Sequence, residues 1–148
     1  MSHVAHLAKR FVTSFSRRGV SDTELDMVRS ALSAGEYEMW FRFNKADRRH
    51  SVEVAERFVA LRPGASRNEI AGVLLHDIGK IVSNLSTLQR VAATVVGPRT
   101  KRFTLYHQHE EIGGDMLRRA GSHSEVIAMV NQTCSADVAD AFRAADNI

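Results

Sequence analysis

The chain has 148 residues, the size of one ordinary domain, and 44% of them are hydrophobic, so a substantial core is expected. Its single cysteine, Cys134, excludes an internal disulfide and a cysteine-based zinc site, and it fits a reducing cytoplasm. The sequence contains no apolar run of roughly 18 residues that would cross a membrane. The net charge of +3 does not indicate nucleic-acid binding, although it suits a small anionic substrate.

The chain is predicted to be all-α, because it has only two prolines and few β-branched runs. Residues 5–15 form a basic amphipathic pattern, which is typical of a membrane-surface helix, of a transit peptide or of a helix that covers the core of its own domain, and we expect the last of these. Capping boxes that begin at Ser21 and Ser66 predict two helix starts. Further helices are expected over residues 36–44, 85–96, 106–119, 125–134 and 137–146. No repeat or linker interrupts the pattern, so residues 1–148 are expected to form one domain, with cover helices at 1–35 and the core at 36–148.

The stretch 70–80 reads I-A-G-V-L-L-H-D-I-G-K. We expect it to be a buried helix that carries His76 and Asp77 and bends at Gly79, where the bend makes room for a ligand. A buried carboxylate without a partner is costly, so Asp77 needs a cation, strong donors or a cleft. A divalent metal would satisfy both side chains. A helix-end aspartate beside a hydrogen-bonded core histidine is the alternative, and the pair alone does not decide between them.

Two further residues extend this pair. His50 is predicted to point inward, because it shares a helical stripe with three apolar residues, Val54, Phe58 and Leu61. Asp146 falls in the last turn of the final helix, where a carboxylate opposes the helix dipole and needs either solvent or a ligand role. Two imidazoles with two carboxylates would suit one divalent ion, and Mn, Fe, Ni, Co, Zn and Mg all remain open.

The order H…HD…D, with L-L-H-D-I-G-K around the doublet, closely resembles the HD superfamily of metal-dependent phosphohydrolases. The segment D-R-R-H-S-V-E-V-A is similar to that family's first-histidine helix, and A-A-D to its final aspartate helix. Y-H-Q-H-E-E-I-G-G is similar to its H-x-x-x-G-A helix, with His109 in the histidine place. The resemblance covers about residues 41–146. It implies a compact helical bundle of the HD-domain type, with one metal ion held by His50, His76, Asp77 and Asp146.

The resemblance also implies a function, the hydrolysis of a phosphoester in a nucleotide or similar small anion by a metal-bound water. Asp77 would orient or deprotonate that water, as a catalytic residue together with Lys80 and His109. The phosphate would be bound by Lys80, His109 and Arg49. We expect no nucleic-acid or membrane partner, and because HD relatives often pair, a homodimer is part of the expectation.

One departure from the family pattern keeps a second interpretation open. Relatives with two or three metals carry a further histidine after the glycine-containing helix, and Gln132 or Thr133 stands in that place here. One metal ion is therefore expected. The missing histidine also favours a non-catalytic metal or nucleotide sensor, or an interaction module. The presence of all four candidate metal ligands favours the metal-dependent phosphohydrolase instead. A helical domain with purely structural histidines is a third interpretation.

Overall fold

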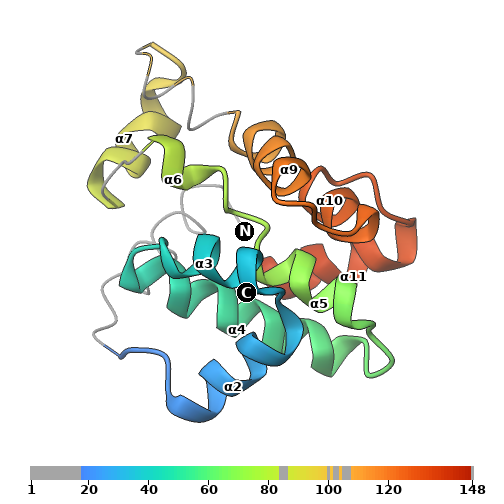
Figure 1. Cartoon of the computed structure of the whole chain (residues 1–148). Helices are drawn as coiled ribbons and strands as arrows, with labels where there is room; N and C mark the ends of the chain where they lie inside the picture. The colour runs from blue at the N-terminus through green and yellow to red at the C-terminus, as the bar shows by residue number, and fades with distance from the viewer. Residues whose placement is uncertain (1–17, 84–86, 100, 102–103, 105–107, 148) are drawn as a thin grey trace.

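The computed structural model describes residues 18–83, 87–99, 101, 104 and 108–147 (Figure 1). Within these residues the chain is helical and contains no strand, which confirms the all-α prediction. The helix predicted at 5–15 and the residue His107 lie outside the described residues. The helices are α2 (Asp22–Ala31), α3 (Ala34–Phe41), α4 (Lys45–Leu61), α5 (Arg67–Leu74), α6 (Lys80–Ser83), α7 (Thr87–Val96), α9 (His109–Arg119), α10 (Ser124–Val130) and α11 (Ala136–Asp146).

Helix starts follow local capping signals. Both predicted capping boxes are present, and the side chains of Ser21 and Ser66 accept hydrogen bonds from the backbone three residues on. A third box at Ser33 starts α3 earlier than expected. The expected end of that helix at Asn44 was wrong, because the Asn44 side chain caps α4 instead and accepts a hydrogen bond from the Asp47 N–H.

Helix α5 occupies the centre of the bundle, where it packs against α4, α10 and α2, while α11 lies along α4 and α9 contacts α10 and α6 (Figure 1). The interior includes Trp40 and Phe58, both fully buried. The predicted inward stripe of α4 is confirmed at Val54 and Phe58 but wrong at Leu61, which is 54% exposed. Leu61 is the last residue of α4, and the chain turns away immediately after it.

The 70–80 stretch is not one helix. Helix α5 ends at Leu74, residues 75–79 form a turn that contains His76 and Asp77, and α6 begins at Lys80. The Val73 carbonyl accepts the His76 ring Nδ1–H at 2.6 Å together with a long 3.4 Å hydrogen bond from the His76 backbone N–H. A side chain that bonds a nearby carbonyl in this way competes with the helical ladder. The doublet therefore follows a helix end, whereas the sequence predicted that it lies within a helix.

Glycines bring α9 onto this turn. A Cβ atom on Gly79 would overlap the backbone of His109, so α9 fills the space beside this glycine, and the expected ligand space beside His76 and Asp77 stays a prediction. Gly113 and Gly114 in α9 also allow close approach, because a Cβ on Gly113 would lie 3.1 Å from the Gly79 nitrogen and one on Gly114 would overlap the Asn131 side chain. These contacts fix the distance between α9 and the doublet.

The predicted helix at 125–134 ends earlier, at Val130, because the Thr133 N–H turns back to the Ala128 carbonyl and Gln132 adopts a positive φ of 57°. None of the helices in the described part of the chain is both long and apolar enough to cross a membrane.

Candidate metal centre

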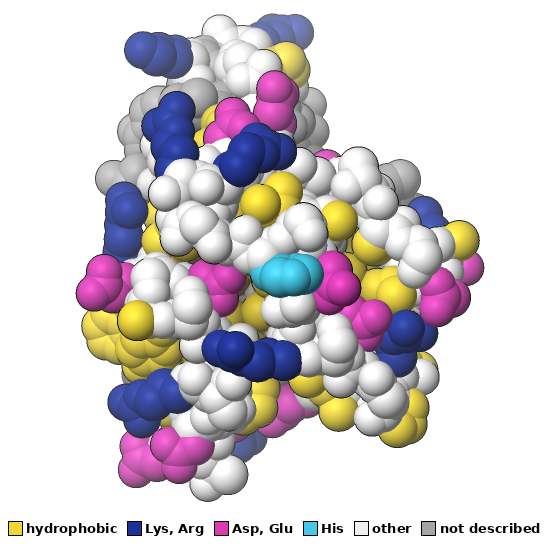
Figure 2. Space-filling model, turned by 45° about the vertical axis from the view of Figure 1, so that its right-hand side comes forward, with side chains coloured by type: hydrophobic (Ala, Val, Ile, Leu, Met, Phe, Trp, Pro, Cys, Tyr) yellow, Lys and Arg dark blue, Asp and Glu magenta, His cyan; other side chains and the backbone are white. Residues whose placement is uncertain are grey.

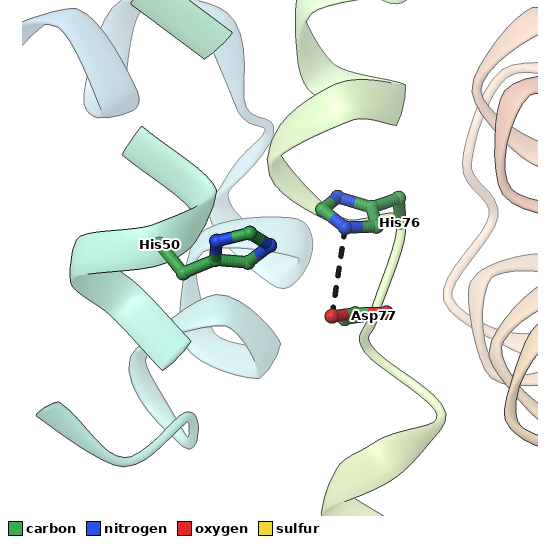
Figure 3. Close-up of side chains that lie close together, drawn as sticks. All are labelled: His50, His76 and Asp77. Carbon is green, nitrogen blue, oxygen red and sulfur yellow. Dashed lines mark ion pairs between the residues drawn. The ribbon is translucent and has the colours of Figure 1, made fainter. Parts of the chain in front are cut away.

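Three segments that are distant in sequence bring four candidate ligands together. His50 comes from α4, His76 and Asp77 from the turn after α5, and Asp146 from the last turn of α11. Ligand atoms of His50, His76 and Asp77 all lie within 4.8 Å of one another (Figure 3). Asp146 Oδ1 is 3.2 Å from His50 Nε2 and 3.8 Å from His76 Nε2. The structure therefore groups the four residues that the sequence analysis proposed as ligands.

The His76 ring has a defined tautomer. A carbonyl oxygen only accepts hydrogen bonds, so the 2.6 Å contact with the Val73 carbonyl requires the proton on Nδ1. Burial lowers the pKa of His76 and outweighs the attraction of Asp77 and Asp146 for the protonated ring. The imidazole is therefore neutral near pH 7, with a lone pair on Nε2. In metal-binding histidines, the ring nitrogen that does not contact the metal commonly donates a hydrogen bond to a carbonyl oxygen, as His76 Nδ1 does here.

That Nε2 atom is buried and has no hydrogen-bond partner among the described residues. Asp77 Oδ2 lies 3.5 Å from it and Asp146 Oδ1 lies 3.8 Å from it. All three atoms present electron pairs, and a neutral His76 has no proton to share among them. A cation would satisfy all three at once, so the donor set fits a divalent metal ion of the kind that takes mixed nitrogen and oxygen ligands.

Asp77 is surrounded by cationic and hydrogen-bonding groups. Its Oδ2 is 2.7 Å from Lys80 Nζ and its Oδ1 is 3.3 Å from His109 Nε2. Burial by itself would raise the pKa of Asp77, but the Lys80 ammonium and the hydrogen bond with His109 hold the pKa well below its ordinary value. Asp77 is therefore a carboxylate at any physiological pH.

The site is partly open to solvent. The side chains of His50, Asp146 and His109 are 25%, 22% and 20% exposed, while Asp77 is only 10% exposed. These exposed fractions would let a small anion reach the edge of the ligand cluster without a change of fold. Elsewhere the surface carries mixed charge, and Figure 2 shows a face on which a histidine lies beside acidic side chains, with lysine or arginine side chains above and below it.

The three residues expected to bind phosphate have different surroundings. His109 is the most accessible of them, while Lys80 is 7% exposed and paired with Asp77. Arg49 is 5% exposed, and its guanidinium donates to both oxygens of Glu24 at 2.8 Å and to Glu53 at 3.1 Å. The phosphate-binding roles stay predictions. For Arg49 these contacts argue against phosphate binding, because its guanidinium already links α2 to α4 beside His50.

Sequence reasoning missed two supporting residues. Arg57 Nε donates to the Ala145 carbonyl at 2.8 Å, directly before Asp146, and the Phe142 ring meets the His76 ring edge-on at a centroid distance of 5.1 Å. Phe142 lies one helical turn before Asp146, a spacing that could have been noticed. No local signal marks Arg57, because its partner is 88 residues away.

A comparison with known families agrees with this geometry. The HD domain family matches residues 48–144, more than half of the chain, and the protein therefore belongs to the HD domain family. The match includes His50, His76, Asp77 and His109 and ends two residues before Asp146, whose place in the cluster comes from the structure. No curated protein and no solved structure gave a match.

Proposed function

We propose that the protein is a metal-dependent phosphohydrolase that cleaves a phosphoester of a nucleotide or similar small anion. The observation that carries the proposal is the buried, neutral His76 Nε2, which faces two carboxylate oxygens with no proton between them. His50, His76, Asp77 and Asp146 would hold one divalent ion. When bound, such an ion supplies Lewis acidity for activating water and for neutralising charge on phosphoryl oxygens.

The chain's own groups have distinct roles in this proposal. Asp77 stays ionised and accepts hydrogen bonds, so it can orient a water molecule and take up its proton. His109 reaches Asp77 from the more exposed side and is placed to donate to a phosphate oxygen. Lys80 adds a positive charge beside the same carboxylate. Arg49 is left out, because Glu24 and Glu53 already engage its guanidinium.

The proposal includes a single metal ion. Gln132 stands where relatives with more metals carry a histidine, and its side chain donates to Glu110 Oε1 at 2.6 Å. An amide that is engaged with a neighbouring carboxylate is a weak candidate for a second-metal ligand. The nucleotide substrate and pairing as a homodimer remain proposals that rest on the family resemblance, and the cytoplasmic location remains a proposal that rests on the single cysteine.

A second candidate is a non-catalytic metal or nucleotide sensor that keeps the HD core. It is favoured by the same Gln132 and by the Lys80–Asp77 pair, which balances one carboxylate without any metal. The enzyme and a metal sensor share metal binding and differ in turnover, whereas a nucleotide sensor or an interaction module does not require a metal ion. The candidates are therefore separated by testing binding first and hydrolysis afterwards.

The first experiment is metal analysis of the wild-type protein and of the His76→Ala/Asp77→Ala double variant. A matched control, His123→Ala/Asp140→Ala, removes the same side-chain types from exposed positions. We expect about one equivalent of a transition metal in the wild type and in the control, and none in the site variant. Absence of metal from the wild type after incubation with Mn, Ni, Co or Zn would contradict the enzyme and the metal sensor, and would favour a non-catalytic interaction module in which His76 and Asp77 are core polar residues.

The second experiment is a hydrolysis screen of nucleoside phosphates with the metal that binds. Turnover that is lost in the His76→Ala/Asp77→Ala variant and kept in the control would support the enzyme. A metal-loaded wild type that hydrolyses none of these compounds would instead favour the sensor.

A further inference from the structure

Asp77 Oδ2 lies between the Lys80 ammonium and the lone-pair nitrogen of His76. Lys80 Nζ is 2.7 Å away, and the lone-pair nitrogen Nε2 of His76 is 3.5 Å away on the site side. The oxygen that would join His76 around a metal ion is thus the one that the lysine holds. Asp77 and Lys80 are each only 7% exposed, so water screens this ion pair weakly.

The turn itself sets this pairing. The Lys80 N–H donates to the Asp77 carbonyl at 2.9 Å, which begins α6 and brings the lysine side chain back over the carboxylate three residues earlier. A buried lysine and a buried aspartate are each costly alone, and together they balance each other. The chain therefore supplies a cation of its own to this site, the Lys80 ammonium.

We propose that Lys80 is an internal competitor of the metal ion for Asp77 Oδ2. Its ammonium balances Asp77 when no metal is bound and leaves this oxygen when a divalent ion binds His76 and Asp77, so Lys80 weakens metal binding. This inference rests on the metal site of the proposed function. Asp77 and Asp146 carry two negative charges at the site, and Lys80 carries one positive charge. Lys80 therefore already neutralises half of the negative charge that would attract a divalent ion.

Competition of this kind has a second consequence. The ammonium that gives up Oδ2 keeps its charge and must find new partners, either solvent or an anion at the site. Lys80 is therefore expected to be more reactive toward amine reagents in the metal-loaded protein than in the metal-free protein.

The direct test measures Mn²⁺ affinity from the loss of the free-ion electron paramagnetic resonance signal. Lys80→Met removes the charge while keeping the chain length, Lys80→Arg keeps the charge, and Lys45→Met removes the same charge from an exposed position on α4. We expect Lys80→Met to bind Mn²⁺ at least about tenfold more tightly than the wild type, or about 1.4 kcal/mol. Lys80→Arg and Lys45→Met should stay within about twofold.

Equal or weaker Mn²⁺ binding by Lys80→Met would overturn the inference. If wild type binds Mn²⁺ and the variant binds it equally, only this inference fails, whereas absence of binding in both proteins overturns the proposed function as well. A Lys80→Met protein that folds only with Mn²⁺ would support the inference, because the metal would then replace the missing cation.

A second measurement uses the wild-type protein and does not depend on the folding of a variant. Acetylation of Lys80 by an amine-reactive ester is followed by mass spectrometry with and without Mn²⁺, relative to Lys45 in the same molecules. We expect Mn²⁺ to raise the relative labelling rate of Lys80 severalfold. A relative rate that Mn²⁺ leaves unchanged or lowers would show that the ammonium keeps its place on Asp77, and the competition would be refuted.

Discussion

The backbones of Gly79 and His109 are in direct contact, so close that a Cβ atom on Gly79 would overlap the His109 carbonyl group. This contact joins the turn that carries His76 and Asp77 to the first residue of α9. It also places the His109 ring 3.3 Å from Asp77 Oδ1. The glycine after the doublet thus sets the position of a candidate phosphate-binding histidine relative to a candidate metal ligand.

Substitution of Gly79 by alanine should be strongly destabilising. The added methyl group has only backbone to move against, and overpacking of this kind typically costs about 1–3 kcal/mol or more. Gly35→Ala is the matched control, because nothing lies within 4 Å of its Cβ position, and it should be neutral or slightly stabilising. Urea denaturation of both variants checks the prediction, which equal midpoints would refute.

Removal of Arg57 should weaken metal binding more than it weakens the fold. Its Nε donates to the Ala145 carbonyl in the last turn of α11, where carbonyls lack helical partners, and so holds the turn that ends at Asp146. We expect Arg57→Met to lower Mn²⁺ affinity about three- to tenfold. Arg143→Met, an exposed change on α11 itself, is the control. Affinities that match in the two variants would contradict a positioning role for Arg57.

The Glu24–Arg49 pair should make stability depend on acid pH. The hydrogen bonds that Arg49 donates to Glu24 are the main cause that lowers the pKa of Glu24 to about 2 from an ordinary value of 4.5. Because the folded pKa is depressed, the pair's stabilisation is present above pH 4.5 and is lost as pH falls toward 2.

Glu24→Gln should therefore be less stable than the wild type by about 1.5–3 kcal/mol at pH 7. The difference should shrink steadily when urea denaturation is repeated at successively lower pH from 5 to 3. A stability difference that stays constant over this range would show that the Glu24 charge contributes little.

His109→Ala should leave the metal in place and slow the reaction. In the proposed one-metal site His109 would contact the ligand Asp77 without being a ligand itself, so activity should fall about tenfold to a hundredfold with metal content unchanged. His123→Ala, at the exposed start of α10, should change neither. Loss of the metal from the His109 variant would instead make His109 a ligand.

Local signals in the sequence predicted much of the fold. Capping boxes act over three residues, so the starts of α2 and α5 could be identified without any tertiary contact. The order of His50, the His76–Asp77 doublet and Asp146 indicated both the family and the metal chemistry, because ligand types and their order are properties of the chain itself.

Tertiary structure decided the geometry of the site. The doublet lies in a turn because the His76 ring bonds the Val73 carbonyl and α9 packs directly on Gly79. Arg49 is occupied by Glu24, which lies 25 residues before it, so its donors are not turned toward a substrate. Each of these outcomes depends on contacts between residues that are distant in the sequence and meet only when the helices pack. Hydrophobic periodicity in the sequence identifies the buried face of a helix, but it does not identify the helix against which that face packs. The sequence by itself therefore determined which residues could bind a metal, and packing decided how each of them is held.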